Sequence, residues 1–451
     1  MKIQINNKEI ETLPGETLLE AARREGYSIP SLCYAKEAKH KSSCMVCAMR
    51  NAATGQIFPS CTTFPVEGMQ IDTESPEIIR TRTLSLELLL SDHRADCEAP
   101  CHTACPGNMD VAAMNRLYDQ GKTSEALALL RDTLVIPATL CYICNAPCEK
   151  ICRKGDVNTH VPVREIKKAL VATTELDKIT STAPGNGRTV AIAGTDPMAL
   201  AAAYHLRKLG YAVTLFEKAD AILSPYIQAG QVPADILQLE IEVIRRLGIE
   251  IIHTQVEPSL NDYDSVIATV YEAPDPRWMT PRTKTKQPAR LVLEGHRLAE
   301  RTHASLSAGA EASEQDNKTF NSTYTRFTEA EKRRFKQSPP SVDHASGCLY
   351  CDCDAKTSCR LRQFATEYSI RSSRYTKNAT YEALHRQEAG RNIWFEQAKC
   401  IKCGLCVYNS NNGFTFKDRG FIMQVVLPEE NKENIDEQLP ELCPTGALYY
   451  R

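Results

Sequence analysis

Cysteine is the residue type in this sequence with the clearest chemical use, because its thiolate binds iron and zinc. The chain has 451 residues and 19 cysteines. An odd number of cysteines argues against a simple disulfide framework, so the sequence predicts metal or iron-sulfur centres. The cysteines form four groups: Cys33, Cys44, Cys47 and Cys61; Cys97, Cys101, Cys105, Cys141, Cys144, Cys148 and Cys152; Cys348, Cys351, Cys353 and Cys359; and Cys400, Cys403, Cys406 and Cys443.

The first group follows two short strand patterns and a helix pattern, "ETLLEAARREG". A close pair of thiolates with one more on each side suits a 2Fe-2S cluster, which needs two sulfurs per iron; a zinc site is the alternative. The spacing resembles the N-terminal ferredoxin domain of the large iron-sulfur subunit of complex I and of iron hydrogenases. This resemblance implies a β-grasp 2Fe-2S domain over residues 1–78.

Residues 79–180 have mostly helical patterns and contain "HRADCEAPCHTACPGNMD" and "CYICNAPCEKICRKG". The segment resembles the N-terminal double-cluster domain of the glutamate synthase small subunit and of dihydropyrimidine dehydrogenase. The resemblance implies two 4Fe-4S clusters, which need eight ligands, whereas only seven cysteines are present. His93 stands four residues before Cys97, the spacing of the histidine-ligated cluster in the complex I subunit, and imidazole is a competent iron ligand.

By family analogy, the first of these two clusters is bound by His93, Cys97, Cys101 and Cys152. The analogy leaves Cys105, Cys144 and Cys148 for the second cluster. The fourth ligand of the second cluster is either a carboxylate near Glu165 or Cys141. Cys141 is the simpler choice, because it brings the number of ligands to eight.

Residues 186–309 begin with a strand, a Gly turn, an Ala-rich helix and a second strand that ends at Glu217. This order resembles the flavin domain of the glutamate synthase family, which implies FAD-type positions at Gly194 and Glu217. Asp196, however, stands at the second glycine of the fingerprint and brings a side chain to the place of the diphosphate. The glycine pair expected within residues 219–231 and the family's NADPH domain are also missing. The sequence therefore favours a degenerate, Rossmann-like domain without FAD.

Residues 310–345 are polar and predict an extended connector before a C-terminal ferredoxin-like domain over residues 346–451. The four cysteines from Cys348 to Cys359 predict a 4Fe-4S cluster, with zinc as the alternative. "CIKCGLC" is the three-cysteine run of bacterial ferredoxins, with Ser410 where the usual fourth cysteine would stand. Cys443, in "CPTGAL", is expected to complete that 4Fe-4S cluster.

The fold class that we predict is therefore multidomain, α+β and α/β. Nineteen cysteines and His93 make twenty ligands, enough for one 2Fe-2S and four 4Fe-4S clusters, or three 4Fe-4S clusters if Cys348–Cys359 bind zinc. A net charge of -2 gives no reason to expect nucleic acid, and no apolar run approaches a membrane span. We accordingly expect a cytoplasmic protein without membrane insertion.

These features predict an electron-transfer subunit of an oxidoreductase complex rather than a catalytic subunit, and no catalytic residues are predicted. The resemblance to complex I implies a partner of the NADH- and FMN-binding diaphorase type. By weaker analogy, the second partner is a catalytic subunit such as a hydrogenase or formate dehydrogenase. The alternatives are an FAD-containing oxidoreductase of the glutamate synthase small-subunit type, and a structural scaffold subunit.

Overall fold

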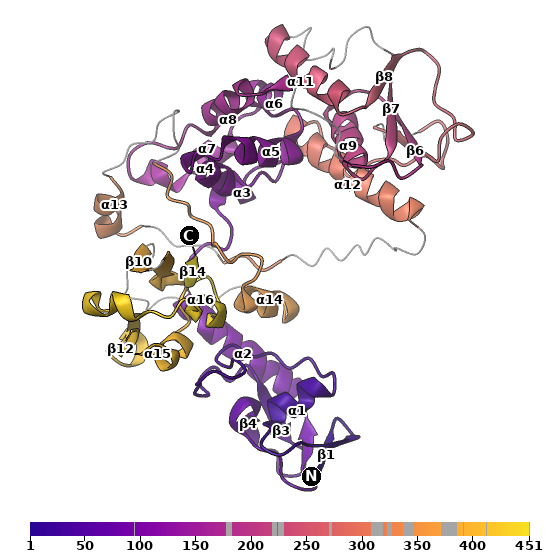
Figure 1. The fold of residues 1–451 in the computed structure, drawn as a ribbon. Coiled ribbons are helices and arrows are strands. Elements are labelled where there is room, and N and C mark those ends of the chain that lie inside the picture. Colours follow the sequence, from indigo (N-terminus) through magenta and orange to yellow (C-terminus); the bar gives the residue numbers. More distant parts are fainter. Residues whose placement is uncertain are drawn as a thin grey trace. The chain divides into compact units, whose positions relative to one another are not determined.

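The computed structural model describes two compact units, and the first contains both ends of the chain (Figure 1). The first unit comprises Met1–Glu98, Asp316–Glu331 and Cys351–Arg451, and the second comprises Ala99–Gln315 and Lys332–Tyr350. The structure describes residues 1–93, 95–176, 183–218, 223, 230–269, 273–307, 319–322, 327–336, 347–370, 386–390, 392–411 and 413–450. Most of the predicted connector and of residues 219–231 lies outside these ranges. The sequence predicted five consecutive segments, whereas the two units interrupt one another along the chain.

The N-terminal part of the first unit is a five-stranded sheet with one helix packed against it. The strand order is β2-β1-β5-β3-β4, with β1 parallel to β5 and the other neighbours antiparallel. A capping box formed by Thr17 and Glu20 starts the helix, which buries Leu18 and Leu19 in the core. The elements are β1 (Lys2–Ile5), β2 (Lys8–Glu11), α1 (Leu18–Arg24), β3 (Ala48–Asn51), β4 (Ile57–Pro59), η1 (Ser60–Thr62) and β5 (Gln70–Asp72).

The rest of the first unit consists of helices and two small sheets. The long helix α2 is tied to its neighbours by the buried Arg82, which donates to the carbonyl of Ala48 and to the hydroxyl of Tyr368. Strands β10, β11 and β14 form an antiparallel sheet, and β12 pairs with β13. The elements are α2 (Pro76–Asp92), α14 (Arg360–Glu367), β10 (Arg386–Gly390), β11 (Ile393–Glu396), η5 (Gln397–Lys399), α15 (Leu405–Asn409), β12 (Thr415–Lys417), η6 (Gly420–Ile422), β13 (Gln424–Val426), η7 (Glu429–Asn434), α16 (Leu439–Leu442) and β14 (Leu448–Tyr450).

The second unit begins with short helices whose apolar sides share a core. The buried carboxylate of Glu240 accepts hydrogen bonds from the backbone N–H groups of Ala138 and Thr139, each at 2.8 Å, and so caps the start of α6. The elements are α3 (Pro100–Thr103), α4 (Val111–Asp119), α5 (Thr123–Leu134), α6 (Pro137–Ile143), α7 (Pro147–Lys150), η2 (Arg153–Asp156) and α8 (Val163–Ala172); a further helix, α13, spans Glu329–Phe335.

A parallel four-stranded sheet in the order β8-β7-β6-β9 follows these helices in the second unit. Figure 1 shows α9 and α12 side by side. Their close approach requires Gly295, because a Cβ there would lie 2.2 Å from the carbonyl oxygen of Met198. The elements are β6 (Thr189–Ala193), α9 (Pro197–Lys208), β7 (Ala212–Glu217), α11 (Ala234–Arg246), β8 (Glu250–His253), β9 (Ser265–Ala268) and α12 (Pro288–Leu306).

Within the described part of the chain, no single helix has both the length and the apolar character needed to cross a membrane, and α5 and α6 meet these criteria only as a pair bent by 65°.

Candidate metal centres

The first cysteine group is buried where the loop after α1 meets β3 and η1. The Sγ atoms of Cys33 and Cys44 lie 3.3 Å apart, and Cys61 lies within η1. The hydroxyl of Ser60 donates to the carbonyl of Cys47 at 2.7 Å and joins the two halves of the site. All four side chains are buried, so they form a set of sulfur donors screened from water: Cys33, Cys44, Cys47 and Cys61.

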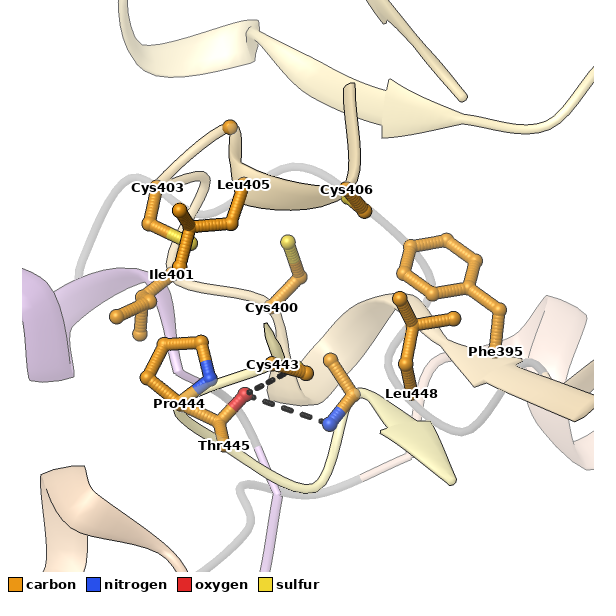
Figure 2. Close-up of a pocket in the computed structure, with 12 residues that line it drawn as sticks. Phe395, Cys400, Ile401, Cys403, Leu405, Cys406, Cys443, Pro444, Thr445 and Leu448 are labelled. Atoms are coloured by element: carbon orange, nitrogen blue, oxygen red, sulfur yellow. Dashed lines mark hydrogen bonds between the residues drawn. The ribbon is translucent and has the colours of Figure 1, made fainter. Parts of the chain in front are cut away.

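The last cysteine group lines a pocket in the C-terminal part of the first unit (Figure 2). Gly404, with φ of +81°, turns the chain into α15 between Cys403 and Cys406. Figure 2 shows the Sγ atom of Cys400 directed into the space between the other lining residues. Burial is the main reason that the pKa of the Cys403 thiol is raised, and Cys443 and Cys33 raise it further. The sulfurs are thus close enough to influence one another in an apolar pocket.

A third set of donors joins residues that are distant in sequence. The backbone N–H of Cys353 donates to the carbonyl of Cys97 at 3.1 Å, and Cys97 and Cys359 share one apolar cluster. Burial raises the pKa of the Cys97 thiol to about 11 and that of Cys359 to about 12. Such thiols stay protonated near neutral pH unless a bound cation displaces the proton. The structure therefore groups Cys97 with Cys353 and Cys359, whereas the sequence interpretation grouped it with Cys101 and Cys152.

His93 is the nitrogen donor that the sequence predicted as an iron ligand. The imidazole is 5% exposed, and no other residue in the described part of the chain forms a hydrogen bond with its Nδ1. Burial, followed by the charge of Lys399, lowers the pKa of His93 to about 4, so the ring is neutral near pH 7. A neutral imidazole is the form that binds metal ions. A buried, neutral imidazole with an Nδ1 atom that forms no hydrogen bond among the described residues fits a metal ligand.

A fourth set surrounds Lys167, a buried lysine of α8. Burial acts to lower the pKa of Lys167, but the nearby cysteines, in their thiolate form, outweigh this effect and raise it. Cys141 is itself buried on α6, where burial raises the pKa of its thiol to about 12. Glu165, by contrast, is exposed and pairs with Lys168 at 3.0 Å. The cysteines whose charges act on Lys167 are Cys105, Cys141, Cys144 and Cys148.

A fifth set lies near Lys154, whose side chain is 2% exposed. Burial lowers the pKa of Lys154, while the thiols of Cys152 and Cys348 oppose this shift. The side-chain amide of Asn115 donates to the Cys348 sulfur at 3.5 Å. Cys101 packs against the same apolar core as Cys152 and Cys348. Cys348 thus contacts a different part of the chain from Cys353, whose backbone N–H bonds to Cys97.

The sequence interpretation searched for the ligands of each centre in one local stretch, so it did not consider that Cys97 lies beside Cys353. The number of cysteines in each group contained a signal for a different grouping. The group from Cys97 to Cys152 has only seven cysteines for two clusters, and the group from Cys348 to Cys359 was assumed to bind one centre by itself. The alternative hypothesis is that one cluster takes cysteines from both groups.

The FAD-type positions form contacts within the chain itself. Gly194 has φ of +118°, and a Cβ there would lie 2.8 Å from the hydroxyl of Thr269. Asp196 is the N-cap of α9 and accepts a hydrogen bond from the backbone N–H of Ala199 at 2.8 Å. The hydroxyl of Thr195 donates to the carboxylate of Glu217. The helix N-terminus and Glu217 thus both have partners from this chain.

Two family models match the chain. Residues 1–76 match a 2Fe-2S iron-sulfur cluster binding domain, and residues 91–178 match dihydropyrimidine dehydrogenase domain II, a 4Fe-4S cluster domain. Together with the buried sulfur sets, these matches define an iron-sulfur protein that carries a 2Fe-2S domain followed by a 4Fe-4S domain. This agrees with the two resemblances derived from the N-terminal sequence.

Among curated proteins, the chain is similar to subunits of oxidoreductases. The NADP(+)-dependent formate dehydrogenase subunit beta of Moorella thermoacetica is 33% identical over an alignment of 207 residues, and the match covers 38% of this chain and 29% of that protein. The NADPH-Fe(3+) oxidoreductase subunit beta of Geobacter sulfurreducens is 27% identical over an alignment of 190 residues, with coverage of 39% of this chain and 28% of that protein. The NADP-reducing hydrogenase subunit HndD of Solidesulfovibrio fructosivorans is 29% identical over an alignment of 164 residues, with coverage of 34% of this chain and 27% of that protein. The chain spans less than a third of the length of each of these relatives.

Proposed function

We propose that this protein is an electron-transfer subunit that relays single electrons between other subunits of an oxidoreductase complex. The observation that carries the proposal is one apolar cluster in the first unit that contains cysteines of three different sets. Cys33 and Cys44 represent the first set, Cys97 and Cys359 the third, and Cys403 packs against the same cluster. Three one-electron centres that share a core can exchange electrons over short distances.

Hydrogen bonds between these sets support the proposal. Lys39, between Cys33 and Cys44, and Asn409, at the end of α15, exchange two hydrogen bonds of 2.9 and 2.8 Å. The backbone N–H of Arg360 donates to the carbonyl of Pro444 at 3.0 Å, which joins the residue after Cys359 to the residue after Cys443. Such direct contacts keep neighbouring ligand sets at constant distances, as a relay requires.

The ligand sets that we propose bind one 2Fe-2S cluster and four 4Fe-4S clusters. Iron-sulfur clusters accept and donate one electron, and the residues around them determine how readily they do so. Cys351 is the remaining cysteine, and its spacing of three from Cys348 allows both thiolates to bind one centre. The sets are Cys33, Cys44, Cys47 and Cys61 for 2Fe-2S; and for 4Fe-4S, His93, Cys97, Cys353 and Cys359; Cys101, Cys152, Cys348 and Cys351; Cys105, Cys141, Cys144 and Cys148; and Cys400, Cys403, Cys406 and Cys443.

The protein's own contribution to the relay is to exclude water and to supply charge. Buried thiolates are costly in an apolar environment unless cations offset their charge. Lys154 lies near Cys152 and Cys348, Lys167 lies near the cysteines of α6 and α7, and Lys399 lies near Cys353 and His93. Buried cations at these positions favour the more negative, reduced state of a centre.

The partners that we propose are a diaphorase-type subunit and a catalytic subunit such as a hydrogenase or formate dehydrogenase. The names of the relatives support this proposal, since they include subunits of a formate dehydrogenase and of a hydrogenase. The cytoplasmic location stays a prediction. We propose that the parallel sheet of the second unit is a degenerate Rossmann-like domain without FAD, because its helix N-terminus is capped by Asp196.

Metal and flavin analysis of the anaerobically purified full chain tests the proposal. We expect roughly 18 irons per chain, the sum for one 2Fe-2S and four 4Fe-4S clusters, with neither flavin nor zinc. About one FAD per chain would instead support the glutamate synthase type of oxidoreductase. A chain with fewer than about four irons and no redox-active signal would refute the relay and leave the scaffold interpretation.

A further inference from the structure

Lys399 occupies a position between two of the proposed centres. It directly precedes Cys400, and its side chain is completely buried. Its ammonium group donates to the carbonyl of Asp352 at 3.2 Å, next to Cys353. Its own carbonyl accepts a hydrogen bond from the hydroxyl of Thr445 at 2.8 Å. One residue thus connects the chain around Cys353 with the Cys-Pro-Thr-Gly turn at Cys443.

The packing around Lys399 brings the same two ligand sets into contact. A Cβ added to Gly446 would lie 2.3 Å from the Cys353 sulfur, so this sulfur rests against the bare backbone of Gly446. The hydroxyl of Thr445 lies 3.7 Å from the sulfur of Cys443. The charge of Lys399 also acts on the imidazole of His93. The ammonium group is therefore close to two ligands of the His93, Cys97, Cys353 and Cys359 set.

Ion pairs fix the position of the Lys399 ammonium group. Its ammonium group pairs with the Oε2 atom of Glu396 at 2.7 Å, and the same oxygen pairs with the Nε atom of Arg386 at 3.1 Å. Asp354, which is partly exposed, is 3.9 Å from the ammonium group. Removal of Lys399 leaves Glu396 paired with Arg386, so the variant loses one positive charge without leaving Glu396 unpaired.

We propose that Lys399 is a positioning residue that raises the reduction potential of the centre bound by His93, Cys97, Cys353 and Cys359. A buried positive charge stabilises the additional negative charge of a reduced centre, and low polarity around it strengthens the effect. The inference rests on the proposed function, because it requires a cluster at this set.

The test is a redox titration of the full chain, followed by electron paramagnetic resonance. In Lys399→Met we expect the equilibrium constant for reducing the histidine-ligated centre to fall at least tenfold, which is 59 mV for a one-electron couple. His93→Cys identifies the signal of this centre, because it changes one of its ligands. The 2Fe-2S signal is the internal control and should keep its potential.

Two further variants separate charge from packing. Lys399→Arg keeps the positive charge. The equilibrium constant for reducing the histidine-ligated centre should therefore stay within about threefold of the parent value, below the tenfold change that marks a lost charge. The double variant Lys399→Met with Glu396→Gln also removes the nearby anion, so it should recover part of the shift. If Lys399→Met loses its clusters, Lys399→Gln keeps a hydrogen-bond donor near the Asp352 carbonyl and gives the same measurement.

The outcomes are distinguishable. An unchanged potential in a Lys399→Met or Lys399→Gln protein with full iron content would overturn this inference while leaving the relay intact. An equal shift in Lys399→Arg and Lys399→Met would show that packing, and not charge, is responsible. A parent protein without iron-sulfur signals would contradict the proposed function itself.

Discussion

The proposed ligand set of Cys97 and Cys353, which lie far apart in the sequence, leads to the sharpest prediction. Cys97 and Cys353 are connected by a backbone hydrogen bond of 3.1 Å, although a whole compact unit separates them in sequence. If both bind one centre, Cys97→Ser and Cys353→Ser should each remove the same resonance signal. Each variant should also lose about four of roughly 18 irons, the content of one 4Fe-4S cluster.

The iron content of the double variant distinguishes one shared cluster from two separate clusters. Two ligands of one cluster are not additive, so Cys97→Ser with Cys353→Ser should lose about four irons, whereas ligands of two different clusters would lose about eight. Cys101→Ser is the matched control, because Cys101 is close to Cys97 in sequence but lies in the second unit. It should remove a different signal. The reasoning is refuted if Cys97→Ser and Cys101→Ser abolish the same signal and Cys353→Ser abolishes another.

Three further predictions concern the second unit. Burial raises the pKa of Glu240 from 4.5 to about 7, so the folded state binds its proton more tightly than the unfolded chain does. The free energy of unfolding should therefore fall by about 3 kcal/mol between pH 4.5 and pH 7. Denaturant titrations at several pH values measure this change, and Glu240→Gln should remove it. Asp196→Gly removes the side-chain cap of α9 and should cost only roughly a few tenths of a kcal/mol in the same assay, because glycine is itself tolerated at this position. Released-flavin measurements should show no gain of FAD, and recovery of bound FAD would contradict a domain that has lost its site. Gly295→Ala forces a Cβ toward the carbonyl of Met198 and should lower stability by roughly 1–3 kcal/mol, while Ala289→Gly removes a buried methyl group from the same helix and should cost only about 1 kcal/mol.

Much of the local structure was predictable from the sequence because it depends on neighbouring residues. The strand and helix patterns from Val190 to Lys218 correspond to β6, α9 and β7, since apolar periodicity reports which side of an element is buried. The run from Cys400 to Cys406 likewise predicted a local binding loop, and the structure places these cysteines around one pocket. The matches to a 2Fe-2S domain and a 4Fe-4S domain confirm the two N-terminal resemblances.

The choice of Cys141 over Glu165 as a ligand stays a prediction, but the burial of each residue depends on the packing of helices. Cys141 and Glu165 were both compatible with the spacing of the second cluster. In the structure, Cys141 is buried beside Lys167, and Glu165 is exposed and paired with Lys168. One helical turn has buried and exposed sides, and which side faces a neighbour depends on how α6 and α8 pack together.

By itself, the sequence determined the kind of chemistry, since the number of cysteines and their local spacing identify iron-sulfur ligands. It also determined the short loops that carry ligands close together in the chain. Only the tertiary structure decided that Cys97 is grouped with Cys353 and Cys359, and that Lys399 lies beside them. The physical reason is that spacing describes only short stretches of chain. A site built from distant segments depends on which apolar surfaces pack together across the whole fold.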